Sequence, residues 1–225
     1  MLVGHHAVGF AAKSLAPRVS LGTLQVACVF PDLLTFALQL AGVEHARVVP
    51  GITAFSPLDG YEIAISHSLA TNVLWAVIFA GAYFGWCRNL RGACVLSGVV
   101  FSHWVLDFIS HRPELPLVPG VHWYVGLGLW NSIPLTFVVE GALWLIGILV
   151  YVRATKPTSR PGTFGLYALI GLLTLAWVRT PFAPPPPGDF SAAALLALLV
   201  VYSGLFALAY WIDACRTIRV ITLRT

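Results

Sequence analysis

Apolar runs of about 20 residues recur along this sequence and are separated by short polar or basic segments. A helix of that length crosses the hydrocarbon core of a bilayer, because each helical residue adds about 1.5 Å. Only 10% of the 225 residues are charged, whereas 58% are hydrophobic. A soluble domain carries about 25% charged residues. The sequence therefore predicts an all-α fold, a polytopic integral membrane helical bundle.

The apolar runs divide the chain into a short first helix and a series of spans. We expect the first helix over about residues 5–15, as a re-entrant helix, followed by about five or six spans. The expected spans cover about residues 21–41, 66–86, 93–111, 130–152, 164–179 and 190–212. Between them, residues 44–62 and the connector PFAPPPPGD are expected to be irregular or extended. We assign residues 1–153 to a metal-site helical membrane core, and residues 154–225 to a basic linker and a C-terminal two-helix membrane hairpin.

The basic residues predict how the bundle is oriented. If the spans alternate, one side carries Lys13, Arg18, Arg88, Arg91, Arg153, Lys156, Arg160, Arg216, Arg219 and Arg224. By the positive-inside rule this side is cytoplasmic, and so is the C-terminus. The net charge of +4 is spread over short loops, which indicates orientation in a membrane and no nucleic-acid partner. We therefore expect an integral protein of a bacterial inner (plasma) membrane, in contact with its lipids.

The segment SHWVLDFISH places three ionisable residues at steps of four, where they share one face of a helix. His103 and His111 are about 12 Å apart along the axis, too far to bind the same metal ion. Asp107 lies between them, about 6 Å from each. The stripe predicts two metal positions bridged by Asp107, suited to zinc or a similar ion. Ionisable groups inside a membrane are functional by default, which favours this reading.

Residues of other spans reach a similar depth. Counted from the ends of their spans, His103, Asp32 and Glu140 are each roughly 15 Å deep. His67 and His111 lie near the outer ends of their spans, so the whole set converges in the outer half of the bundle. Pro31 supports this for Asp32, since a broken helix is tolerated at membrane depth where it lines a cavity.

Three assignments stay open at this point. His5 and His6 are adjacent in the first helix, and we prefer His6 as a ligand. Glu140 is either a ligand or a general base. His45 and His122, with which nothing aligns, are expected to be interfacial residues, and Asp213 is expected to pair with the nearby Arg216.

Several short motifs resemble the YdjM-like family of membrane-bound metal-dependent hydrolases. They are GHHAVGF, FPDLL, SHSLATN, SHWVLDFISHRPELPL and GLGLWNSIPLTFVVEG, within residues 4–145. That family is distantly related to zinc-dependent phospholipase C and to the single-strand-specific zinc nucleases, which are helical enzymes that hold three zinc ions. The resemblance implies an N-terminal ligand at His6, a next pair at Asp32 and His67, a His-x-x-x-Asp motif at His103 and Asp107, and a further ligand at His111.

The sequence departs from those soluble relatives at their second His-x-x-x-Asp motif, where it offers only Asn131 and Glu140. We therefore expect two Zn²⁺ ions, or two with a weaker third site.

The function that these residues favour is metal-dependent hydrolysis of phosphoesters in lipid or lipid-linked substrates, by metal-activated water. Asp107 would bridge the ions, and Glu140 would be a further catalytic residue. Two alternatives use the same residues: a metal-ion or proton transporter, in which they line a path, and a membrane scaffold with a closed structural metal site.

Overall fold

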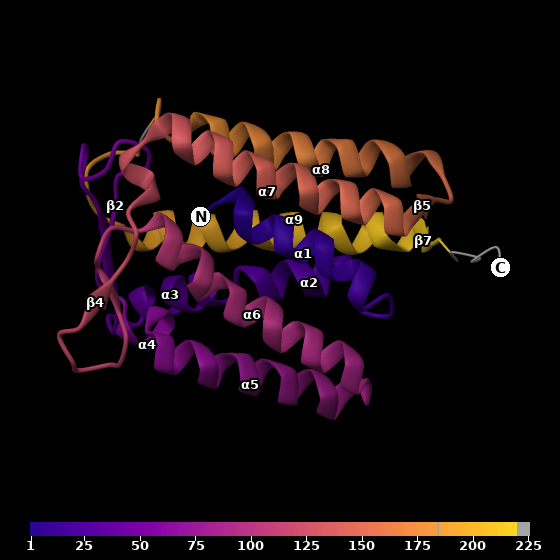
Figure 1. The fold of residues 1–225 in the computed structure, drawn as a ribbon, viewed down its shortest axis with the longest axis horizontal. Coiled ribbons are helices and arrows are strands. Elements are labelled where there is room, and N and C mark those ends of the chain that lie inside the picture. The colour runs from indigo at the N-terminus through magenta and orange to yellow at the C-terminus, as the bar shows by residue number, and fades with distance from the viewer. Residues whose placement is uncertain (184, 220–225) are drawn as a thin grey trace.

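The structure is a computed structural model that describes residues 1–183 and 185–219 (Figure 1). Most of this part is helical, as the sequence predicts. Its helices are α1 (Val3–Leu15), α2 (Leu21–Cys28), α3 (Phe30–Leu40), α4 (Ala64–His67), α5 (Leu69–Cys87), α6 (Leu90–Ser110), the 3₁₀ helix η1 (Leu129–Asn131), α7 (Ile133–Ala154), α8 (Arg160–Arg179) and α9 (Ala192–Ala214).

Five of these helices, α5 to α9, are long and apolar enough to cross a membrane. The pair α2 and α3 would form a sixth span if counted together, and it is bent by 60° at its break. This agrees with the five or six spans expected from the apolar runs.

The break between α2 and α3 follows from Pro31. Proline has no backbone N–H and clashes with the preceding turn of a helix, but the first turn of a helix tolerates it. The chain therefore ends α2 at Cys28, turns at Val29, and starts α3 with Pro31 in its first turn. The turn also leaves the Cys28 carbonyl free to accept a hydrogen bond from outside the helix.

Helix α1 lies in the middle of the bundle (Figure 1). It packs chiefly against α7, and also against α2 and α6. The two helices approach each other closely at Gly147, where an added Cβ would lie 2.4 Å from the Ala7 carbonyl oxygen. The start of α1 is held by Glu140 of α7, whose side chain accepts hydrogen bonds from Gly4 N at 3.1 Å and Trp177 Nε1 of α8 at 2.9 Å.

The C-terminal helices pack directly on the first ones. Helix α9 contacts α2 and α3 as well as α8. At the end of α9, Asp213 accepts a hydrogen bond from Lys13 Nζ of α1 at 2.8 Å, and the same ammonium donates to the Val19 carbonyl. The expectation that Asp213 pairs with Arg216 is therefore wrong. Lys13 is the partner because α1 ends beside α9, which the distance along the chain does not reveal.

Short strands join the helices at both ends of the bundle, a feature that the all-α expectation omitted. The antiparallel sheet β2–β1–β6 and the hairpin β3–β4 lie at one end, and the pair β5–β7 at the other (Figure 1). Their bounds are β1 His45–Val48, β2 Leu58–Glu62, β3 Leu115–Pro116, β4 Tyr124–Val125, β5 Thr155–Pro157, β6 Gly188–Asp189 and β7 Arg216–Ile218. Pairing satisfies backbone groups that extended connectors would otherwise leave without partners.

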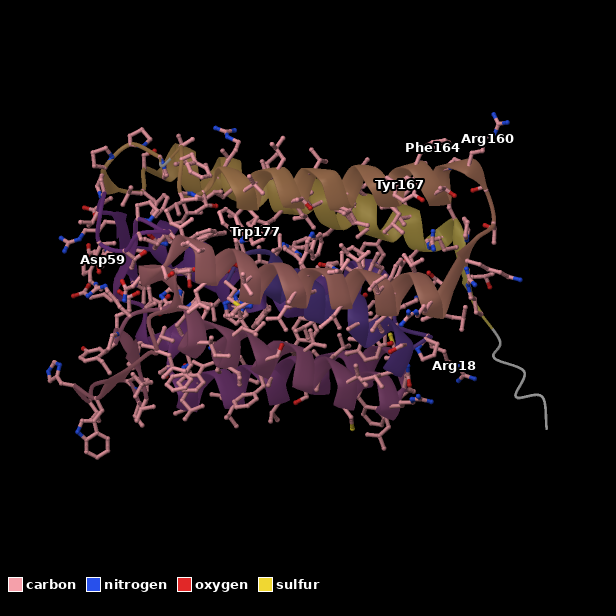
Figure 2. All side chains as sticks on the ribbon, turned by 45° about the horizontal axis from the view of Figure 1, so that its top comes forward. Arg18, Asp59, Arg160, Phe164, Tyr167 and Trp177 are labelled. Carbon is pink, nitrogen blue, oxygen red and sulfur yellow. The ribbon has the colours of Figure 1, made fainter. Side chains whose placement is uncertain are left out.

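The two ends of the bundle differ in charge. The turns α1–α2, α5–α6 and α7–α8 lie at the same end as β5–β7 (Figure 1). Figure 2 shows Arg18 and Arg160 at this end and Asp59 at the opposite end. The basic residues grouped by the sequence analysis thus belong to one end of the molecule, apart from Arg224, which lies outside the described residues.

We predict that Gly147→Ala destabilises the protein by roughly 1–3 kcal/mol, the usual cost of overpacking a tight contact. The new methyl group would meet the backbone of α1 at Ala7, which cannot yield without moving the helix. Gly98→Ala in α6 is the matched control, because its Cβ would meet nothing within 4 Å. Thermal unfolding of the two variants and the wild type in the same detergent measures their stabilities. Equal melting temperatures would contradict the close packing of α1 on α7.

Candidate metal centre

Six ionisable side chains meet beside the N-terminal end of α1. Five belong to four helices, and the sixth follows directly after α6. They are His5 of α1, Asp32 of α3, His67 of α4, His103 and Asp107 of α6, and His111 at the end of α6. All are buried except Asp32, whose side chain is 31% exposed. Two overlapping groups have ligand atoms within 4.8 Å of one another: His5 with His103 and Asp107, and Asp32 with His67 and His103.

Asp107 turns its two carboxylate oxygens to different imidazoles. Its Oδ1 lies 3.0 Å from His5 Nε2 and 3.7 Å from His111 Nε2. Its Oδ2 lies 3.0 Å from His103 Nε2 and 3.6 Å from His67 Nε2. Asp32 Oδ1 faces the second side, 3.5 Å from His67 Nε2 and 3.6 Å from His103 Nε2. The Met1 ammonium donates a hydrogen bond to Oδ1 at 2.6 Å and lies 2.9 Å from His5 Nε2.

His103 is held by the break between α2 and α3. Its Nδ1 lies 2.9 Å from the Cys28 carbonyl oxygen, which can only accept a hydrogen bond. The proton of a neutral His103 ring is therefore on Nδ1, and its Nε2 presents a lone pair to the two aspartates.

His67 is held by a chain of two hydrogen bonds. The carboxylate of Glu44 accepts from the backbone of Ile65 and Ser66, at 2.7 and 2.8 Å, and from Ser66 Oγ at 2.6 Å. Because the hydroxyl group of Ser66 donates its only proton to Glu44, its oxygen must accept a hydrogen bond from His67 Nδ1, at 2.8 Å. Nε2 of His67 is then also unprotonated in the neutral ring.

The other two imidazoles differ in their support. His111 Nδ1 donates to Glu114 Oε1 at 2.7 Å, and the ring packs on Trp130 with centroids 4.3 Å apart. His5 stacks on His103 with centroids 3.8 Å apart. Its Nδ1 is buried and has no hydrogen-bond partner among the described residues.

These hydrogen bonds to Nδ1 leave a concentration of negative charge and lone pairs at the centre of the group. Nε2 of His67 and Nε2 of His103 are 3.3 Å apart, and both present lone pairs beside two carboxylates. Such an arrangement is repulsive unless a positive charge lies among the atoms. The Met1 ammonium supplies one on the Oδ1 side of Asp107, and on the Oδ2 side a metal ion or an extra proton on a ring would supply it. Imidazole and carboxylate are the ligands that zinc-like ions take, and an Nδ1 bonded to the protein is usual for a ligating histidine. The residues present fit a divalent ion.

The structure brings together five of the predicted residues, Asp32, His67, His103, Asp107 and His111. It does not bring His6 to them. His6 Nδ1 donates to Gln25 Oε1 at 2.6 Å, and the ring stacks on Tyr202. His5 lies beside Asp107 in its place, because one step along a helix turns a side chain by about 100°.

Glu140 also lies apart from the group. Both of its oxygens already accept hydrogen bonds, from Gly4 N and from Trp177 Nε1, and it is fully buried. A carboxylate beside the first N–H groups of a helix stabilises the positive end of the helix dipole. The structure thus gives Glu140 a supporting contact to α1 and no contact with the imidazoles.

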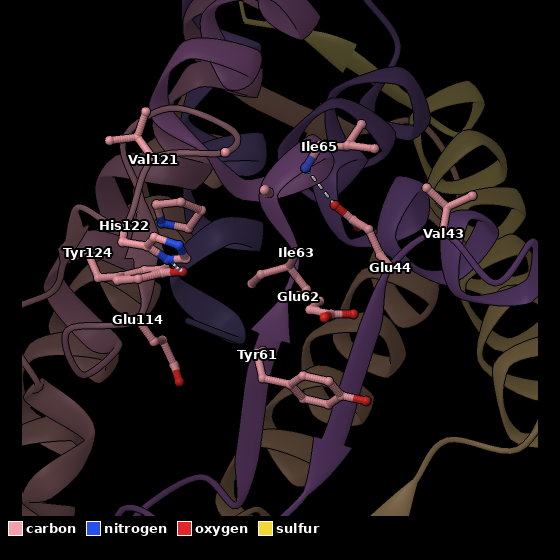
Figure 3. Close-up of a pocket in the computed structure, with 14 residues that line it drawn as sticks. Val43, Glu44, Tyr61, Glu62, Ile63, Ile65, Glu114, Val121, His122 and Tyr124 are labelled. Carbon is pink, nitrogen blue, oxygen red and sulfur yellow. Dashed lines mark hydrogen bonds between the residues drawn. The ribbon is translucent and has the colours of Figure 1, made fainter.

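Glu44 and Glu114 are the residues that sequence reasoning missed. Glu114 carries a local signal, since it stands three residues after His111. Glu44 carries none, because it lies in a loop more than 20 positions before His67 and reaches it only through Ser66. Both glutamates also line an outer pocket of about 290 Å³, where Figure 3 shows them on either side of Ile63.

A separate cavity of about 310 Å³ lies over the imidazoles. Its floor is polar and consists of His5, Asp32, His67, Asp107 and His111. Its walls are largely apolar and include Val29, Phe36, Leu58, Ile63, Trp130, Phe190, Leu198 and Tyr202. The polar group is therefore reached through an apolar chamber. Comparisons with protein-family models, with curated proteins and with solved structures find no match for this chain.

We predict that Ser66→Ala lowers the affinity for Zn²⁺ by about 10- to 100-fold, because it removes the contact that orients His67. Ser68→Ala is the control. Ser68 caps α5 by accepting from Thr71 N, so its loss should cost about 1 kcal/mol of stability without changing the affinity. Competition with a chromogenic chelator and thermal unfolding separate the two effects. An equal change of affinity in both variants would contradict the role of Ser66.

Proposed function

We propose that this chain is a membrane-embedded, metal-dependent hydrolase that acts on phosphoesters of lipid or lipid-linked substrates. The observation that carries the proposal is the convergence of four imidazole Nε2 atoms on the two oxygens of Asp107, with three of the rings fixed from behind through Nδ1. The resemblance of the sequence motifs to the YdjM-like family favours the same chemistry.

The distances suggest how the residues would divide between two ions. The Oδ1 side of Asp107 offers His5 and His111, where an ion would take the place of the Met1 ammonium. The Oδ2 side offers His67, His103 and Asp32. An imidazole nitrogen has one lone pair, so His103 can serve only one ion, whereas a carboxylate can bridge two. We therefore infer a pair of ions, bridged by Asp107, and no role for His6 or Glu140 as ligands.

When bound, divalent ions would supply an activated water and a Lewis acid for a phosphoryl oxygen. The residues of the chain supply the rest. Glu44, Glu114 and the Cys28 carbonyl hold the rings in one tautomer and orientation. The partly exposed Asp32 presents carboxylate oxygen to the cavity, where a substrate would lie. The apolar walls limit the access of bulk water to the floor.

The membrane location rests on the five apolar helices and on the basic end of the bundle. We infer that this end is cytoplasmic, with the C-terminus, in a bacterial inner membrane. The imidazoles would then lie toward the outer half. Between them and the basic end, α2 and α6 pack through an apolar cluster that includes Leu24, Leu96 and Val100. This packing closes the site toward the basic end, which disfavours a transport path. The partly exposed Asp32 leaves the site open to the cavity, which favours a catalytic site over a structural one.

The test is elemental analysis of protein purified without chelators. We expect about two equivalents of divalent metal in the wild type, and loss of both in Asp107→Asn, because the bridging carboxylate holds both sides. Glu140→Gln is the control and should keep its metal.

Turnover is measured on a model phosphodiester and on phospholipids in mixed micelles, with metal-stripped protein as the blank. A wild-type protein that carries no metal would sink the proposal. Bound metal without turnover of any of these substrates would leave the structural alternative.

A further inference from the structure

We propose that the apolar cavity over the imidazoles binds one hydrocarbon chain of a membrane lipid, and that α9 with its preceding connector forms the wall that selects it. This inference rests on the proposed function for the reaction at the floor of the cavity. It goes further in assigning a ligand-binding role to the C-terminal helices, in which the sequence shows no motif.

The C-terminal part of the chain supplies much of the wall. Thr180, Pro185 and Phe190 lie between α8 and α9, and Leu198 and Tyr202 belong to α9. Phe36 of α3, together with Phe55, faces the same space. These side chains are aromatic or aliphatic apart from Thr180 and the tip of Tyr202, so the wall offers a hydrocarbon chain dispersion contacts and few polar partners.

The wall is fixed in place by aromatic packing. The ring of Tyr202 stacks on His6 with centroids 6.4 Å apart and lies 6.0 Å from the ring of Phe36. Tyr202 thus joins α9 to α1 and α3. His6, which does not reach the metal group, supports Tyr202 from behind the wall by this contact.

The size of the cavity sets how much of a lipid it can hold. Its volume of about 310 Å³ is at the lower end of the range for small-molecule sites, roughly 300–1,000 Å³. A headgroup phosphate on the polar floor and the first part of one chain would fill it. A second chain and the remainder of the first must lie outside.

Photocrosslinking tests the proposal directly. The probe is a phosphatidylglycerol that carries a diazirine near the ester of one acyl chain, in vesicles of phosphatidylethanolamine and phosphatidylglycerol. We expect labelling of Phe36 and Tyr202 to exceed that of Val77, an exposed residue of α5. Leu198→Trp, which fills the cavity, should lower labelling of Phe36 and Tyr202 by about tenfold.

Leu196→Trp is the matched control. Its position is two residues away on α9, and its side chain is 53% exposed, so it adds the same bulk on another face of the helix. Labelling of Phe36 and Tyr202 should be unchanged. If Leu198→Trp does not fold, Phe36→Trp fills the same cavity from α3, and labelling of Tyr202 is then the readout.

The proposal fails if the wall residues are labelled no more than Val77, or if filling the cavity leaves their labelling unchanged. Asp107→Asn separates this failure from that of the proposed function. We expect this variant to lose metal and to keep its labelled wall. A wild-type protein with a labelled wall and no metal would overturn the hydrolase proposal alone. A metal-loaded protein with an unlabelled wall would overturn only the proposed binding site for a hydrocarbon chain.

Discussion

A carboxylate buried among four imidazoles is the constraint around which this bundle is built. Burying one unpaired charge in an apolar interior costs several kcal/mol, and Asp107 is almost completely buried. The fold surrounds both of its oxygens with nitrogen atoms from the N-terminus, α1, α4 and α6, and the Met1 ammonium donates to Oδ1. Each of those segments must be placed accurately, so the arrangement of α1, α4 and α6 is tied to this single side chain.

The supporting contacts show why the bundle contains breaks where an ordinary span would be continuous. The turn at Val29 frees the carbonyl that orients His103, and the step between α4 and α5 at Ser68 puts His67 at the end of a short helix capped by Glu44. The first interruption is located inside a run that is apolar enough to be a single span. Both interruptions are costly in backbone hydrogen bonds, and they are placed where a side chain uses the freed group.

Spacing along one helix and depth within a span were enough to predict most of the candidate site. The step of four residues fixed the row of His103, Asp107 and His111, and Pro31 pointed to Asp32. Choosing between His5 and His6 needs the rotation of α1 about its axis, which depends on its packing at Gly147 and on no local pattern. Glu140 has the right depth and faces α1 and α8 instead. Depth along a helix says nothing of direction around it. The strands and Glu44 lie in connectors whose partners are distant in sequence, so local patterns could not predict them.

The contact between Lys13 and Asp213 has a consequence for biogenesis. The first helix emerges from the ribosome well before the last one, and the buried ammonium of Lys13 meets its carboxylate only when α9 has joined the bundle. Strand β6, which pairs with β1, joins at the same late stage. The interior must therefore stay unfinished through most of translation, and a nascent chain interrupted before α9 would lack the cavity wall that Leu198 and Tyr202 supply and the carboxylate that pairs with Lys13.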